Sequence, residues 1–142
     1  MKLTNTLSMK RKSGMTLLEL TVVILVLLSL ISILFVGARA WKKGSDRSAN
    51  ILNVRNVQQA VRGHQNTRGY TTSDAVTLTD IFGTSGYLKT PTPPIPSVTA
   101  YTFGTNYPAV GTLFVTNSDL GGTDGEYFYT AAEITAGKVS DW

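Results

Sequence analysis

The sequence predicts an α+β fold, in which one long N-terminal helix packs on a small antiparallel β-sheet. The first observation is an apolar run at 15–38 that contains no proline. The second is a helical apolar stripe in the polar stretch that follows, and the third is a change to glycine-, threonine- and proline-rich sequence after residue 69. These features divide the 142 residues into a leader at 1–14, a transmembrane helix at 15–38, an amphipathic helical stem at 39–68 and a small β-rich globular head at 69–142.

The apolar run at 15–38 is long enough to cross a membrane. As a helix its 24 residues span about 36 Å, which exceeds the hydrocarbon core of about 30 Å. In lipid, only a helix satisfies the hydrogen bonds of its own backbone. Glu19 is the single charged residue of the run, and an ionised acid in hydrocarbon costs roughly 2.5 kcal/mol or more. Glu19 therefore predicts a partner outside its own chain and assembly within a membrane.

Charge is distributed unevenly along the chain, whose formal net charge is +4. The leader has four basic residues and no acidic one, the stem has seven basic residues against Asp46, and the head has seven acidic residues against two basic ones. A basic stem can attract the acidic head of another copy or the anionic headgroups of a bilayer. The alternative is a solvated helix face without a partner. Basic residues flank the apolar run on both sides, so charge alone does not orient it.

The stem is predicted to be an amphipathic helix. It contains no proline, and its apolar residues recur at helical spacing on one narrow face. The sequence at 66–69 is a stop signal, so the helix is expected to end between Asn66 and Gly69. The apolar stripe consists of Ile51, Val54, Val57 and Val61.

The head is expected to begin with a short helix and an extended connector. Thr77 is the predicted N-cap of a helix at 77–82, with Asp80 three residues later in the position of a capping box. Four prolines at 90–96 preclude a helix or a central strand there.

Three short segments are the predicted strands of the head: 100–103, 112–116 and 126–130. The glycine-containing segment 118–125 predicts the turn between the last two strands. Val115 and Phe128, or their neighbours, are expected to face the stripe of the stem. The C-terminal segment 131–142 fits either a strand or a helical turn.

One motif joins the leader to the apolar run. Lys10-Arg11-Lys12-Ser13-Gly14 is followed directly by Met15-Thr16-Leu17-Leu18-Glu19. The basic leader, the glycine before an apolar residue, the acid five positions later and the unbroken apolar run together resemble the processing site of type IV prepilins and type II secretion pseudopilins. The resemblance is close from Lys10 to about Ala38, and it covers the stem and the β-rich head only in general plan.

This resemblance implies a pilin-like structural subunit of a pilus or of a secretion pseudopilus. A prepilin peptidase would cut between Gly14 and Met15 on the cytoplasmic face, and Met15 would be N-methylated. Glu19 would pair with the N-terminal amine of a neighbouring copy, and Thr16 would contribute to packing between helices. The implied partners are other copies or related subunits, the prepilin peptidase, the inner-membrane assembly platform and the lipid bilayer.

The resemblance also implies a location in the bacterial inner membrane. The chain would cross it once, with a cytoplasmic N-terminus and a periplasmic or extracellular head, before it enters a filament. The chain has no cysteine, so the C-terminal disulfide loop of many pilins is impossible here.

Two other interpretations of the N-terminal region stay open. Ala38-Arg39-Ala40 has the A-x-A pattern of a secretory signal peptide, and a cut after Ala40 would give a secreted or membrane-anchored small domain with an unknown binding role. The apolar run is longer than the 7–15 residues of a usual signal peptide core. A DNA-uptake filament subunit is the second alternative, since Arg55 and Arg62 lie on similar helix faces. The acidic head and the stem without aromatic residues after Trp41 disfavour binding of nucleic acid.

The sequence argues against an enzyme and predicts no cofactor. The one histidine, His64, is expected on the surface of the stem, and the chain contains no HExxH, GxSxG or phosphate-binding glycine loop. The calcium candidates are Asp119, Asp124 and Glu126, whose spacing fits no ligand pattern. The alternative is that Asp119 and Asp124 simply form turns.

Overall fold

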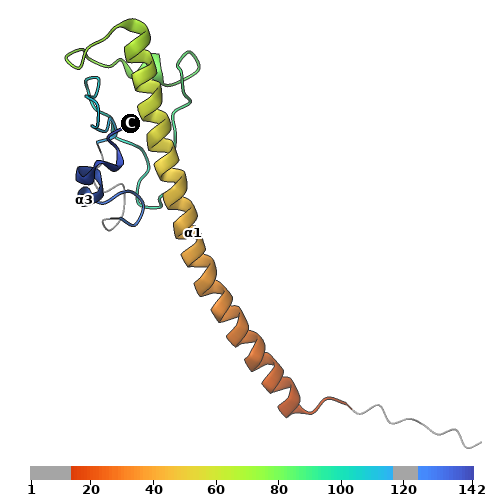
Figure 1. The fold of residues 1–142 in the computed structure, drawn as a ribbon. Helices are drawn as coiled ribbons and strands as arrows, with labels where there is room; N and C mark the ends of the chain where they lie inside the picture. Colours follow the sequence, from red (N-terminus) through yellow and green to blue (C-terminus); the bar gives the residue numbers. More distant parts are fainter. Residues whose placement is uncertain (1–13, 117–124) are drawn as a thin grey trace, which may run out of the picture. The chain divides into compact units, whose positions relative to one another are not determined.

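The structure is a computed structural model that describes residues 14–116 and 125–142. Its elements are the helices α1 (Leu17–Arg68), α2 (Leu78–Ile81) and α3 (Ala131–Glu133) and the π-helical turn η1 (Ile134–Lys138) (Figure 1). The chain forms two compact units, which meet in the sequence between Ala38 and Arg39.

Helix α1 contains 52 residues and no proline. It ends where Gly69 adopts a φ of +71° and the N–H of Tyr70 donates to the carbonyl of Gln65 at 3.0 Å. A left-handed glycine followed by a hydrogen bond that closes the last turn is a Schellman cap. The predicted end of the helix between Asn66 and Gly69 is confirmed.

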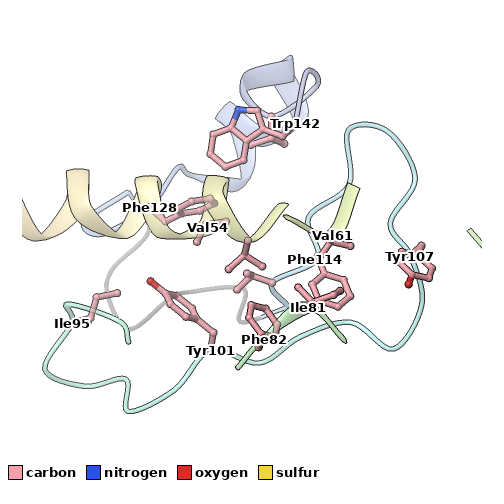
Figure 2. Packing of buried hydrophobic residues seen from close by; sticks show 13 residues of the cluster. Val54, Val61, Ile81, Phe82, Ile95, Tyr101, Tyr107, Phe114, Phe128 and Trp142 are labelled. Atoms are coloured by element: carbon pink, nitrogen blue, oxygen red, sulfur yellow. The ribbon is translucent and has the colours of Figure 1, made fainter. Parts of the chain in front are cut away.

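The apolar stripe of the stem forms one side of the core of the head. Val54, Val57 and Val61 are fully buried, and Ile51 is partly buried against them. Each valine that is removed from water in this way stabilises the fold by about 1.5–3 kcal/mol. Aromatic rings supply most of the opposite side (Figure 2). The head contributes Ile81, Phe82, Ile95, Tyr101, Tyr107, Phe114, Val115, Phe128, Val139 and Trp142 to this core.

Val115 and Phe128 both belong to the core that contains the stripe, as the sequence predicted. Val115 is 5 % exposed and so is Phe128. Both side chains thus point into the core, although the backbone around them differs from the predicted strands.

The predicted antiparallel sheet is wrong. Residues 69–116 and 125–142 contain no β-strand, and their pairing is limited to three isolated bridges: Ala75 with Asn106, Phe82 with Leu88, and Phe103 with Val115. The last bridge joins two of the predicted strands, 100–103 and 112–116, and consists of the hydrogen bonds from Gly104 N to Phe114 O and from Thr116 N to Thr102 O. The fold is a long helix with a mainly irregular head, so the α+β class is not supported.

A buried side chain of α1 explains why pairing stops there. Gln58 is fully buried, its Nε2 donates to the carbonyl of Thr112 at 2.8 Å, and its Oε1 accepts from the N–H of Phe114 at 2.9 Å. In an extended strand these groups lie on the same edge as Phe114 O, which accepts from Gly104 N, so they are the groups that would continue the pairing with 100–103. The helix side chain satisfies them instead, which removes the need for a neighbouring strand.

Asn50 makes a similar connection to the third predicted strand, 126–130. Asn50 is fully buried, and its Nδ2 donates to the carbonyl of Tyr127 at 2.8 Å. Its Oδ1 accepts from the hydroxyl of Tyr101 at 2.6 Å. The segment that contains Phe128 is thereby held against α1 and forms no bridge with 112–116.

The short helices agree with the sequence in place but not in capping. Helix α2 lies within the predicted 77–82, yet the side chain of Thr77 makes no capping hydrogen bond. The segment 131–142, which fitted either a strand or a helical turn, forms α3 and η1. Thr130 and Glu133 form a complete capping box at the start of α3, which the sequence analysis overlooked.

The connector at 90–96 contains neither a helix nor a strand, as its prolines predicted. It contacts the stem at Thr92, whose carbonyl accepts from Asn53 Nδ2 at 3.2 Å. Most of the predicted turn at 118–125 lies outside the described residues.

We expect Gln58→Ala to lower the free energy of unfolding by about 2–4 kcal/mol, because it leaves the buried groups of Thr112 and Phe114 without partners. Chemical denaturation of the full chain in neutral detergent, followed by near-ultraviolet circular dichroism, measures this. Gln59→Ala is the matched control, since Gln59 is exposed, and it should change the free energy by less than about 0.5 kcal/mol. Equal effects of the two substitutions would contradict the role given to Gln58.

Glu133 makes the stability of the head depend on pH. Hydrogen bonds from the N–H and hydroxyl of Thr130, with Arg47 and Lys138 nearby, hold the pKa of Glu133 below its ordinary value of 4.5. A carboxyl whose pKa is lowered by folding stabilises the fold above its unfolded pKa and loses that contribution as the pH falls through the folded value. Glu133→Gln should thus be less stable than the parent at neutral pH, and the difference should shrink below pH 4.5. Unfolding curves between neutral and acidic pH test this; a difference that is constant with pH would refute it.

Candidate functional site at the start of the apolar helix

The predicted cleavage site lies in exposed, non-helical chain. Gly14, Met15 and Thr16 precede α1 and have no regular secondary structure, and Met15 is 72 % exposed. A Cβ built at Gly14 would meet no atom within 4 Å. The described residues therefore leave the Gly14–Met15 bond open to a peptidase that binds its substrate as extended chain.

Glu19 lies in the first turn of α1 and forms a capping box with Thr16. Its Oε2 accepts from the N–H of Thr16 at 2.8 Å and from the hydroxyl of Thr16 at 3.0 Å. The N–H of Glu19 in turn donates to the hydroxyl oxygen of Thr16 at 3.2 Å. The positive end of the helix dipole also favours a carboxylate in this turn.

The capping box changes the expectation that Glu19 has no partner in its own chain. Thr16 satisfies Oε2, whereas Oε1 has no hydrogen-bond partner among the described residues. Pairing with the amine of another copy stays a prediction, and Oε1 is the oxygen that would accept from that amine. A threonine followed three residues later by a glutamate, directly before an apolar run, is a known capping signature. Thr16 could therefore have been assigned this role from sequence, in addition to the packing role predicted for it.

The hydroxyl groups of the apolar segment are satisfied within α1. Thr21 donates to the carbonyl of Leu18 at 2.9 Å, Ser29 to that of Val26 at 2.8 Å, and Ser32 to that of Leu28 at 2.8 Å. A hydroxyl that bonds a carbonyl one turn earlier needs no water. These three side chains are therefore compatible with a lipid environment.

The segment Leu17–Ala38 presents a large uncovered apolar surface. All of its residues are exposed, and no part of its most apolar 18-residue window is buried. Soluble monomers rarely expose contiguous apolar patches of this kind. By length and composition α1 is long and apolar enough to cross a membrane, either as a membrane span or as a signal anchor.

The calcium candidates gain no support as a group. Glu126 lies 2.5 Å from Lys43, with which it forms an ion pair, whereas Asp119 and Asp124 lie outside the described residues. Within residues 14–116 and 125–142, no three His, Cys, Asp or Glu side chains cluster as metal ligands.

His64 is buried, which corrects the prediction that it lies on the surface. It is 2 % exposed, and its Nδ1 lies 2.8 Å from the hydroxyl of Tyr107. The rings of Tyr70, Tyr87 and Tyr107 surround it at centroid distances of 5.4–6.0 Å. Burial raises the pKa of Tyr107. This cluster packs the end of the stem against the head, and a helix position flanked by polar residues gave no sign of it.

No protein-family model, curated protein or solved structure matches this chain.

Proposed function

We propose that this protein is a structural subunit of a type IV pilus or a type II secretion pseudopilus, cut between Gly14 and Met15 and assembled through α1. The position of Glu19 is the observation that carries this proposal. The carboxylate lies five residues after Gly14, in the first turn of an uncovered apolar helix, with Oε1 unpartnered among the described residues. The role is mechanical, and no enzymatic activity or cofactor is part of it.

Cleavage after Gly14 would create a positively charged amine at Met15 and would remove the four basic residues of the leader. The amine of one copy and Oε1 of Glu19 in another are complementary in charge. A charge that is buried alone is strongly destabilising, whereas a hydrogen-bonded pair offsets much of the desolvation cost. Since Thr16 already orients the carboxylate through Oε2, the pair would fix the axial register of neighbouring helices.

The uncovered apolar surface of α1 supports assembly of copies side by side. Lipid tails would cover Leu17–Ala38 while the subunit is in the membrane. In a filament outside the membrane, only other apolar helices could cover it, because water would make its exposure unfavourable. The surface includes a shallow apolar hollow lined by Ile31, Leu34, Phe35 and Ala38, into which side chains of a neighbouring helix could pack.

The signal-peptide alternative is less well supported. Its cleavage site at Ala38–Ala40 lies inside the range of α1, whereas Gly14 and Met15 precede the helix. A peptidase that needs extended substrate would have to unwind helical chain at the first site but not at the second. An uncleaved signal anchor would also place the apolar segment in a membrane. Cleavage after Gly14 distinguishes the pilin-like role from this alternative.

Mass spectrometry of the mature protein from its native host should find Met15 as an N-methylated first residue. Gly14→Leu should leave the leader attached, because the bulky side chain would block a site that selects glycine. Ala40→Leu is the matched control, since it blocks only the signal-peptidase alternative, and it should be processed normally. A mature chain that begins at Trp41 would overturn the pilin-like proposal.

Glu19→Ala should leave membrane insertion intact and strongly reduce assembly, because the amine of the neighbouring copy loses its counter-charge. Glu19→Gln keeps a hydrogen-bonding side chain for Thr16 and removes the charge, so it should be equally impaired. Assembly is measured by cross-linking through one cysteine placed at Leu25, which is unique because the chain has no other cysteine. Normal cross-linked yield with Glu19→Gln would show that charge pairing is not required.

A further inference from the structure

A small basic pocket lies between the stem and the head. Its volume is about 240 Å³, which is below the range of drug-sized ligand sites. A pocket of this size suits a compact group. It is lined by Arg39, Lys42, Lys43, Asp46, Pro96 and Tyr127.

Helical spacing brings the charged residues of the pocket to one face of α1. Arg39, Lys42, Lys43 and Asp46 stand at positions i, i+3, i+4 and i+7 of the helix. Pro96 and Tyr127 come from distant parts of the head and form the facing wall. The pocket therefore exists only when the head is folded against the stem.

Two of the three cations have carboxylate partners. Lys42 Nζ lies 2.6 Å from Asp46 Oδ2, and Lys43 Nζ lies 2.5 Å from Glu126 Oε1. The bond to Glu126 raises the pKa of Lys43. Arg39 makes no hydrogen bond and no ion pair with the described residues. The pocket thus keeps one unneutralised guanidinium beside two ammonium groups.

The chemistry of this arrangement fits a phosphate group. A guanidinium presents a rigid fork of N–H donors that matches phosphate oxygens, and lysine ammonium groups add charge without fixed geometry. The exposed ammonium groups can turn towards an anion, since the side chains of Lys42 and Lys43 are 67 % and 61 % exposed. Pro96 and Tyr127 add a partly apolar wall.

The sequence places this pocket directly after the apolar run. Ala38 is the last residue of that run and Arg39 is the next. If 15–38 crosses the bilayer, residues 39–43 fall at the level of the headgroups. Trp41, which is 80 % exposed, has the amphipathic ring that favours this level.

We propose that the pocket binds the phosphate of an anionic phospholipid headgroup and so fastens the head to the membrane surface before assembly. This inference rests on the membrane insertion that is part of the proposed function. A free phosphate ion offers the same chemistry but lacks the second anchor that the apolar segment gives to a lipid. An acidic segment of another copy is a different partner, and it is bulkier than the compact group that a pocket of this volume suits.

Native mass spectrometry of the full chain in neutral detergent tests the proposal, with phosphatidylglycerol as the probe. Retention of phosphatidylglycerol should exceed that of phosphatidylcholine, and inorganic phosphate at equal concentration should not compete. Arg39→Gln should weaken the binding of phosphatidylglycerol about fivefold, which is the expected contribution of one cation near an anionic lipid surface. Arg68→Gln is the control of equal charge change at the far end of α1, and it should have no effect.

A substitution that strengthens the binding of phosphatidylglycerol cannot be explained by a folding defect. Asp46→Asn removes the partner of Lys42 and frees a second cation, so it should strengthen the retention of phosphatidylglycerol severalfold. Equal retention of the two lipids, equal effects of Arg39→Gln and Arg68→Gln, or weaker retention with Asp46→Asn would overturn the inference. So would competition by inorganic phosphate, or a salt-sensitive dimer that Arg39→Gln abolishes.

Flotation with phosphatidylcholine vesicles separates failure of the inference from failure of the proposed function. A chain that does not float with these vesicles contradicts membrane insertion itself. The alternative result is a chain that floats with them and yet shows no preference for phosphatidylglycerol in native mass spectrometry. That result would contradict only the headgroup pocket and would leave the proposed function standing.

Discussion

Asn50 and Gln58, two amide side chains buried on one helix, bond main-chain groups of the head that would otherwise need a β-sheet. Buried N–H and C=O groups must find partners, and in a sheet neighbouring strands supply them. Here the stem supplies them at Thr112, Phe114 and Tyr127. The helix is thus both the hydrophobic wall of the core and a source of hydrogen bonds. A head of this kind depends on its stem both for hydrogen bonds to its buried main-chain groups and for the burial of its apolar side chains.

The sequence predicted the parts of this fold that follow from local rules. Residue spacing and stop signals predicted four features: the end of α1, its valine stripe, the place of α2 and the inward position of Val115. The sheet was predicted wrongly because pairing depends on residues far apart in the chain, and the polar Gln58 resembles a solvent-facing residue in any helical pattern. His64 was misplaced for the same reason. The capping boxes were different, since their signature was visible in the sequence.

The candidate site could be predicted more fully than the head because it is local. Gly14, Met15 and Glu19 belong to one short motif, and the structure adds the hydrogen bonds of Thr16 to one carboxylate oxygen of Glu19. Thr16 holds Oε2, which lets a charged group remain at the start of an apolar helix without a partner from another copy. The same carboxylate keeps Oε1 available. Glu19 can therefore be tolerated in a solitary subunit, and the association proposed for it concerns Oε1. The basic pocket at Arg39 was beyond prediction because its far wall comes from the head.

The limited bridging of the head has a consequence for crowded copies. An open strand edge presents a row of N–H and C=O groups that can recruit a strand from another molecule, and natural proteins protect such edges against aggregation. In 69–116 and 125–142 the bridges never extend into a ladder, and Gln58 binds the groups through which 112–116 would continue its pairing. Heads gathered at high local concentration would thus find no long strand edge in these residues on which amyloid-like growth could start.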